Sequence, residues 1–147
     1  MCPMLTTRRL DTVTSRQVET AIRNAEQNTS GEIVVVVLNY CWTDIHDKAR
    51  SLFLRHGLHK TQERNAVMIL LVAVDREFLV YGDQGINEKV EADFWLKVRD
   101  LMQQGFRAGG IVEGLCNGIA CIGQQLAIHF PNQSNDNELP DGVIHDC

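Results

Sequence analysis

Acidic and amide side chains stand at the ends of three stretches that resemble β-strands. Glu32 opens one stretch, Asn65 opens the next, and Asp83 follows the third. Carboxylate and amide oxygens are the ligands that calcium and magnesium prefer in proteins. Glu88 lies about one helical turn beyond Asp83, and Arg64 directly precedes Asn65. The candidate metal ligands are therefore Glu32, Asp83 and Glu88, with Ca²⁺ or Mg²⁺ as the ion, and Arg64 and Asn65 are further polar candidates.

Two other interpretations of this edge stay open. A helix is expected to begin near Asn87, and its positive end would favour an anion such as phosphate. In the plainer interpretation, Glu32 and Arg64 form a surface ion pair, while Gly82 and Gly85 only shape a turn. Spacing alone favours the plainer interpretation.

A second set of charged residues lies at the opposite ends of the expected strands. It consists of Asp44, Asp75 and Arg76. Ligands usually bind at the carboxyl ends of parallel strands in open α/β sheets, so position favours this alternative edge. Asp44 can instead act at a helix N-terminus, and the other two residues can be turn residues. Clustering of polar residues favours the first edge.

The directions of the strands decide which residues share an edge. Residues 33–38 and 66–74 are continuous apolar runs, as expected of strands covered on both faces. A helical stretch connects them, which implies a parallel pair with a right-handed crossover. Only two residues separate the second run from residues 77–81, so the third strand must be antiparallel. This arrangement brings Glu32, Asn65 and Asp83 to one edge.

The predicted fold class is α/β, with a mixed sheet made of a parallel strand pair and an antiparallel third strand, and with helices on both faces. Helices are expected from residue 14, from Asp44 to near Gly57, over about 87–104 and over 110–129. Trp42 and Trp95 lie in apolar patterns and are expected in the core.

The chain has 147 residues, of which 44% are hydrophobic, and this composition suits one domain. We expect an N-terminal tail over residues 1–10, the α/β domain over residues 11–131 and a polar C-terminal tail over residues 132–147. The tail contains many Asn, Asp and Gln residues, which are typical of surface or disordered segments.

Charge and cysteine content limit the partners. A net charge of −5 and a pI near 5.5 argue against nucleic acid. Five irregularly spaced cysteines without a Cys-x-x-Cys pair indicate a reduced, cytoplasmic protein, and the first residues show no signal peptide. Residues 110–130 are apolar but carry several polar side chains, so we expect a soluble helix and no membrane insertion.

Known catalytic signatures are missing from the sequence. Cys41 is not followed by the arginine that a cysteine phosphatase needs, and Asp75 lacks the second aspartate of phosphoaspartate enzymes. There is also no His-Glu-x-x-His, no phosphate-binding loop ending in Gly-Lys-Ser/Thr and no dinucleotide fingerprint. The residues themselves therefore favour binding over catalysis.

Several short segments, in their order and spacing, resemble the TPM domain family from about residue 10 to residue 141. They are residues 29–33, 65–67, 75–76, 82–86, 94–95, 106–109, 129–131 and 137–140. The resemblance implies a Rossmann-like sandwich, divalent-cation binding at acidic loops and, for some members, phosphatase activity. Many members are membrane-attached or lumenal helpers of larger assemblies. This chain differs by its Gly-Asp-Gln-Gly at residues 82–85, where many members have Gly-Tyr-Gly, and we expect no signal or membrane segment.

Two functional hypotheses follow. The first is a non-enzymatic module that binds a divalent cation and acts on another protein as an assembly partner. The second is a metal-dependent phosphatase, in which a metal at Glu32 and Asp83 polarises a phosphoester and activates water while Arg64 offsets the phosphoryl charge. The sequence leaves open whether the protein is an enzyme.

Overall fold

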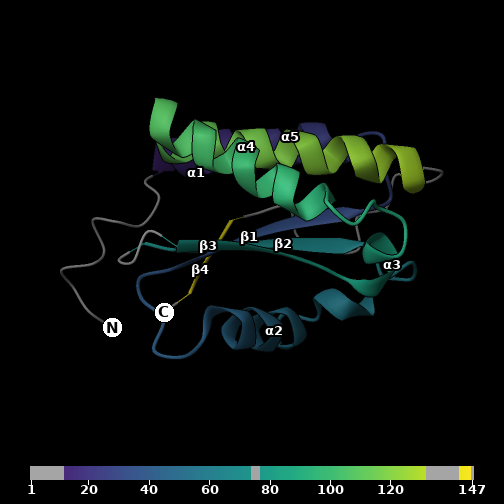
Figure 1. Cartoon of the computed structure of the whole chain (residues 1–147), viewed down its shortest axis with the longest axis horizontal. Helices are drawn as coiled ribbons and strands as arrows, with labels where there is room; N and C mark the ends of the chain where they lie inside the picture. Colours follow the sequence, from purple (N-terminus) through teal and green to yellow (C-terminus); the bar gives the residue numbers. More distant parts are fainter. Residues whose placement is uncertain (1–11, 74–76, 132–142, 147) are drawn as a thin grey trace.

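The computed structural model describes residues 12–73, 77–131 and 143–146, which form a three-layer α/β domain. One sheet lies in the middle, with helices on both faces (Figure 1). One face carries α1 (Thr12–Glu26), α4 (Phe94–Gly109) and α5 (Ile111–His129). The opposite face carries α2 (Ile45–Arg55) and the short 3₁₀ helix η2 (Leu58–Lys60).

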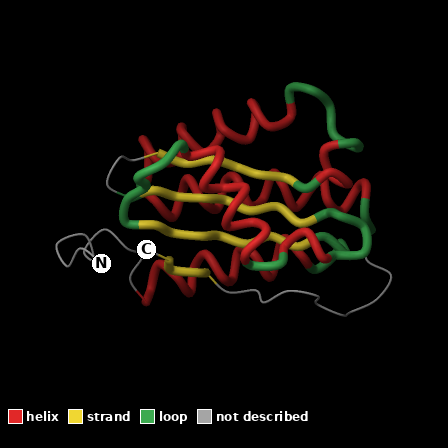
Figure 2. Tube along the Cα trace, turned by 90° about the horizontal axis from the view of Figure 1, so that it is seen from below, coloured by secondary structure: helices red, strands yellow, loops and turns green. Residues whose placement is uncertain are grey.

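The sheet has four strands in the order β3-β2-β1-β4 (Figure 2). Strands β1 (Glu32–Leu38) and β2 (Ala66–Val72) are parallel, and β3 (Glu77–Gly82) runs antiparallel to β2. These directions confirm the predicted parallel pair and antiparallel third strand. The fourth strand, β4 (Val143–Asp146), is parallel to β1 and lies within the segment that was expected to be a polar tail.

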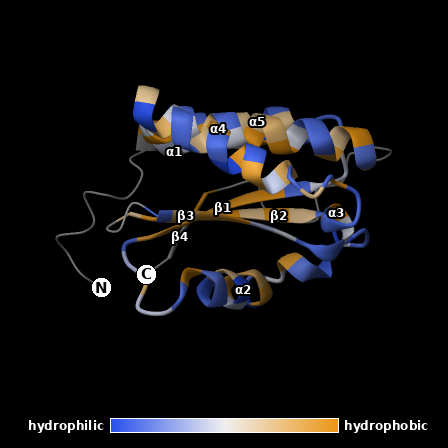
Figure 3. Ribbon diagram, in the orientation of Figure 1, coloured by the Kyte–Doolittle hydropathy of each residue, from blue (hydrophilic) through white to orange (hydrophobic). Residues whose placement is uncertain are grey.

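The central strands are buried on both faces because their side chains alternate between two cores. Every residue of β1 and β2 is buried. Ile33, Val35 and Val37 join the core beneath α1, α4 and α5, while Val34 and Val36 join the core beneath α2. Figure 3 shows the apolar central strands between helices of mixed hydropathy.

The connection after β3 differs from the expected single helix over 87–104. It contains the short helix α3 (Gln84–Asn87), then a non-helical stretch, and only then α4. At the end of α3, the Asn87 side chain makes local hydrogen bonds outside the helix. Its Nδ2 donates to the Gly82 carbonyl at 2.9 Å, and its Oδ1 accepts from Trp95 Nε1 at 2.8 Å.

Trp42 was expected in the core but is 87% exposed, since it lies in the loop before α2, whose N-cap is Asp44.

In the described residues, α5 is the one helix long and apolar enough to cross a membrane, with a mean hydropathy of 1.3. This is weak evidence for a span, because core helices pass the same test, and Leu115, Ile119 and Ile122 of α5 are buried in the core.

Candidate functional site

The amino-terminal edge of the sheet, where β1 and β2 begin and β3 ends, collects most of the buried polar side chains in the described part of the chain. The strand register pairs Glu32 with Ala66 and Val67 with Gly82, as the predicted strand directions require. The buried polar residues around this edge are Glu26, Thr29, Glu32, Thr61, Asn65 and Asp83. Burial of so many polar groups in one place needs local partners.

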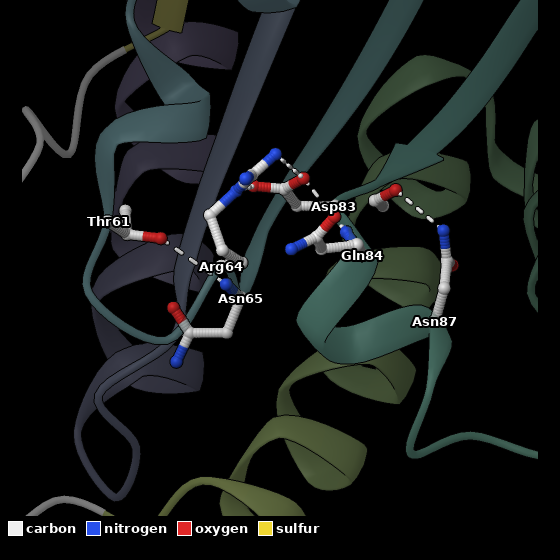
Figure 4. Close-up of polar contacts among 7 residues, drawn as sticks. Thr61, Arg64, Asn65, Asp83, Gln84 and Asn87 are labelled. Carbon is white, nitrogen blue, oxygen red and sulfur yellow. Dashed lines mark hydrogen bonds and ion pairs between the residues drawn. The ribbon is translucent and has the colours of Figure 1, made fainter.

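Arg64 and Asp83 form a bidentate ion pair at this edge (Figure 4). Arg64 Nε donates to Asp83 Oδ2 at 2.7 Å and Arg64 Nη2 donates to Oδ1 at 2.9 Å. Oδ1 also accepts the backbone N–H of Gln84 at 2.8 Å, which caps α3. The hydrogen bond to Asp83 raises the pKa of Arg64 above its usual value. Both carboxylate oxygens of Asp83 are therefore already engaged.

The expected surface ion pair between Glu32 and Arg64 is wrong, because Arg64 bonds Asp83. Glu32 is only 2% exposed, while the Arg64 side chain is 39% exposed. The expectation that Gly85 only shapes a turn is wrong, because Gly85 lies within α3, where it packs closely against residues 63–64. Its N–H donates to the Arg64 carbonyl at 2.8 Å, and a Cβ there would collide with the carbonyl oxygens of Glu63 and Arg64. Arg64 itself has a φ of 53°, in the left-handed region.

A second polar group lies on the other side of the chain. Figure 4 shows the Asn65 side chain pointing away from the Arg64–Asp83 pair. Asn65 Nδ2 donates to Ser30 Oγ at 3.2 Å, and Ser30 Oγ donates to Glu63 Oε1 at 3.3 Å. Asn65 is 1% exposed, and its Oδ1 has no hydrogen-bond partner among the described residues. We call Ser30, Glu63 and Asn65 the Asn65 group.

The carboxyl end of α5 holds the loop that carries Ser30. Thr29 Oγ1 donates to the carbonyl of Leu126 at 2.9 Å and also lies 2.5 Å from the carbonyl of Phe130. The N–H of Ser30 donates to the same Phe130 carbonyl at 3.0 Å. Because the carboxyl end of a helix is the negative end of its dipole, α5 makes this corner favourable for a cation.

The predicted metal ligands Glu32, Asp83 and Glu88 do not form a cluster. In residues 12–73, 77–131 and 143–146, no group of three or more His, Cys, Asp or Glu side chains is placed to hold a metal ion. Asp83 is occupied by Arg64, and Glu88 is exposed at the end of α3. The helix start expected near Asn87 is also wrong, since α3 ends there.

Sequence reasoning named Asn65 but missed two of its neighbours. Ser30 and Glu63 each lie within two residues of a predicted candidate, Ser30 before Glu32 and Glu63 before Asn65. Proximity to these candidates was the one signal that could have found them. Their hydrogen bonds join two loops that are 33 residues apart in sequence, so the pattern of either loop alone does not show them.

At the alternative edge, the structure describes Asp44 but not Asp75 and Arg76, which lie outside the described residues. Asp44 caps α2, and its Oδ1 accepts the N–H groups of His46 at 2.8 Å and Asp47 at 3.3 Å. These backbone hydrogen bonds, that of Asp47 first, hold the pKa of Asp44 below its ordinary value. The expected role of Asp44 at a helix N-terminus is confirmed.

Comparison with known proteins identifies relatives of the domain. A family model described as "TPM domain", with the label TPM_phosphatase, matches residues 6–125. No curated protein sequence matches the chain. The structure is similar to that of the BA42 protein from the psychrophilic bacterium Bizionia argentinensis, with a TM-score of 0.87, 36% identity and coverage of 93% of this chain and 95% of that one.

Two more distant solved structures share the fold. The N-terminal domain of a protein from P. gingivalis has a TM-score of 0.67 and 21% identity, covering 85% of this chain and 83% of that one. The N-terminal domain of the cg2496 protein from Corynebacterium glutamicum has a TM-score of 0.63 and 11% identity, covering 94% and 82%. At these identities the likeness concerns the fold alone.

Proposed function

Because the chain belongs to the TPM domain family, we propose that it is a non-enzymatic module that binds a divalent cation, Ca²⁺ or Mg²⁺, at the amino-terminal edge of its sheet. The proposed ligands are the oxygens of the Asn65 group, in place of the trio expected from the sequence. A cation there would be a structural or regulatory ion for a domain that acts on partner proteins.

The buried Oδ1 of Asn65 is the observation that carries this proposal. A buried amide oxygen without a partner costs about 1–3 kcal/mol, so a site that keeps one is expected to satisfy it with an ion or a water molecule. Hydroxyl, carboxylate and amide oxygens are hard ligands of the kind that calcium takes. Ser30 and Glu63 supply the first two beside Asn65.

The surroundings also favour positive charge. Glu26 and Glu32 are buried acidic residues next to the same loop, and Glu26 Oε2 accepts the N–H of Ile33 at 2.7 Å. The carboxyl end of α5 adds partial negative charge at Ser30. The guanidinium of Arg64 is turned to the other side of the chain and paired with Asp83.

An amide NMR titration of the metal-free protein with calcium and then magnesium tests the proposal. We expect the largest shifts at Ser30, Glu63 and Asn65, at calcium concentrations up to about 10 mM, above the weakest dissociation constants usual for calcium modules. Glu63→Gln should weaken binding at least about tenfold, because it removes the exposed carboxylate ligand. The matched variant Glu88→Gln, which changes the same group outside the Asn65 group, should bind like the wild type.

Two results would reject this ligand set. Weaker binding in Glu88→Gln with unchanged binding in Glu63→Gln would restore the trio Glu32, Asp83 and Glu88. Saturating calcium without shifts at the amino-terminal edge would mean that Asn65 Oδ1 is satisfied by water or by the opposite amide orientation.

Metal-dependent phosphatase activity is the second candidate, favoured by the label of the family model and by the partly exposed guanidinium of Arg64. A phosphoester turnover assay with p-nitrophenyl phosphate, on the sample used for NMR, separates the two functions. Turnover that needs the metal and is lost in Arg64→Gln would support the enzyme. Cation binding without turnover would support the binding module.

A further inference from the structure

The carboxyl-terminal edge of the sheet contains a small acidic pocket that neither function uses. Its volume is about 250 Å³, less than the roughly 300–1,000 Å³ of typical small-molecule sites. The lining residues come from the β1–α2 loop, the start of α2, the end of β2 and the start of β3, and they are Cys41, Thr43, Asp44, Ile45, Val72 and Glu77. A space of this size suits one side chain better than a whole metabolite.

The pocket has two carboxyl groups and, among its described lining residues, no basic side chain; just outside the lining, His46 Nδ1 lies 3.4 Å from Asp44 Oδ1. Asp44 is fixed in place by the N–H groups at the start of α2, so its carboxylate keeps one orientation. Cys41 Sγ donates to the Thr43 carbonyl at 3.1 Å and so fixes the loop from the other side. Glu77 is exposed as the first residue of β3. The walls are therefore acidic, and Asp44 and the β1–α2 loop are held by hydrogen bonds.

Trp42 lies in the same loop, between two lining residues, and is the most exposed large apolar side chain of the described structure at 87%. It packs edge-on against Tyr40, with ring centroids 5.0 Å apart. An indole held in this way has lost part of its rotational freedom before any partner arrives. Exposed Trp side chains that sit beside a pocket are typical anchors of protein interfaces.

We propose that this pocket binds an arginine side chain carried by an extended segment of a partner protein. The guanidinium is planar, bonds carboxylates with several N–H groups and stacks on aromatic rings. Asp44 and Glu77 would take its charge and Trp42 its flat face. The pocket also lies beside β3, which ends the strand order and pairs only with β2 in the described sheet. Such an edge can align an extended segment.

The test uses the full chain and two blocked peptides, acetyl-Ala-Ala-Arg-Ala-Ala-amide and its citrulline counterpart, which is neutral but similar in shape. The chain has two Trp residues, one at each edge of the sheet. The Arg peptide should shift the Nε1–H signal of Trp42 and the amides of Cys41, Thr43 and Glu77. The Nε1–H of Trp95, which is bonded to Asn87, should stay in place.

Variants separate a specific pocket from general attraction to an acidic protein. Glu77→Gln and Trp42→Ala should each weaken binding about two- to fivefold, as expected for an exposed ion pair or cation–π contact. Glu91→Gln, which removes an exposed carboxylate at the other edge, should have no effect. Equal shifts with the citrulline peptide, equal shifts at Trp95, or equal weakening in Glu91→Gln would each overturn the proposal, as would an absence of any shift at Trp42.

Discussion

Arg64 and Asn65 are neighbours in sequence with opposite roles at the amino-terminal edge. Arg64 turns to one side and neutralises Asp83, whereas Asn65 turns to the other side and leaves a buried oxygen open. The acidic residue that best resembled a metal ligand in the sequence is therefore the one already paired. The buried oxygen without a hydrogen-bond partner among the described residues belongs instead to Asn65, the neighbour of Arg64.

The Arg64–Asp83 pair should contribute to stability as a coupled unit. Asp83→Asn keeps an oxygen that can accept the N–H of Gln84 but loses the charge, and Arg64→Gln loses the opposite charge. The double variant should be more stable than the sum of the single effects indicates, because the Asp83 carboxylate is only 6% exposed. Urea unfolding of the four proteins measures this coupling.

Lys97 and Asp93 provide the matched control for that cycle. They are four residues apart in sequence, 3.5 Å apart in space and more than half exposed. Their coupling should be close to zero, because solvent screens an exposed pair. Equal coupling in the two pairs would show that the Asp83 carboxylate is as well solvated as a surface group.

Gly85→Ala should destabilise the protein by at least about 1–3 kcal/mol, the usual cost of overpacking. The new methyl group would meet the carbonyl oxygens of Glu63 and Arg64, which belong to backbone and cannot turn aside. Gln84→Ala, at an exposed neighbouring position, is the control and should change stability little. Thermal unfolding of the two variants and the wild type measures these changes in stability. An unchanged midpoint in Gly85→Ala would contradict the close approach of α3 to residues 63–64.

The sequence predicted which residues share the amino-terminal edge but not which of them touch. Strand direction follows from the lengths of the connections, and these can be read from the chain. Contacts depend on the side of the backbone to which each residue turns. For Arg64 this depends on a left-handed φ of 53°, which a non-glycine residue seldom adopts and which its sequence does not signal.

At the scale of elements, long apolar runs were predictable and short or interrupted ones were not. The runs that became β1 and β2 are β-branched, continuous and bounded by polar residues. β4 has only Val143 and Ile144 as apolar residues within a polar segment, which is too short for a periodic signal. The break between α3 and α4, where the Asn87 side chain makes its hydrogen bonds, leaves no signal in the periodicity.

The cap of α2 should make part of the stability depend on pH. The pKa of Asp44 is lowered from 3.8 in the folded state, so its contribution is complete well above that value. The contribution is lost as the pH falls below 3.8 through the lower folded pKa. Asp44→Asn keeps a capping oxygen but does not titrate. The melting temperature of this variant should therefore fall less between pH 7 and pH 3 than that of the wild type.

The control for this measurement is Asp100→Asn, at an exposed position in α4. It should show the acid sensitivity of the wild type, because Asp100 caps no helix. If Asp44→Asn and the wild type lose the same stability over the acid range, the cap contributes nothing through its charge. Circular dichroism at closely spaced pH values provides the data.

At the scale of the whole molecule, one sheet separates two apolar cores, and successive apolar residues of its central strands alternate between them. Ile69 and Leu70 follow each other in β2 and are both fully buried, but Ile69 belongs to the core beneath α1, α4 and α5, and Leu70 to the core beneath α2. Because β2 cannot leave one core without leaving the other, the two cores should unfold together.

Ile69→Ala and Leu70→Ala test this expectation. Each should lower the free energy of unfolding by about 2–5 kcal/mol, the usual cost of such a cavity. Each should also keep a single urea transition with an unchanged m-value, since the surface exposed on unfolding is the same. Fluorescence of the tryptophans and far-ultraviolet circular dichroism should give coincident curves. A second transition in Leu70→Ala alone would mean that the layer of α2 can detach while the other core stays folded, and the two edges of the sheet could then act as independent sites.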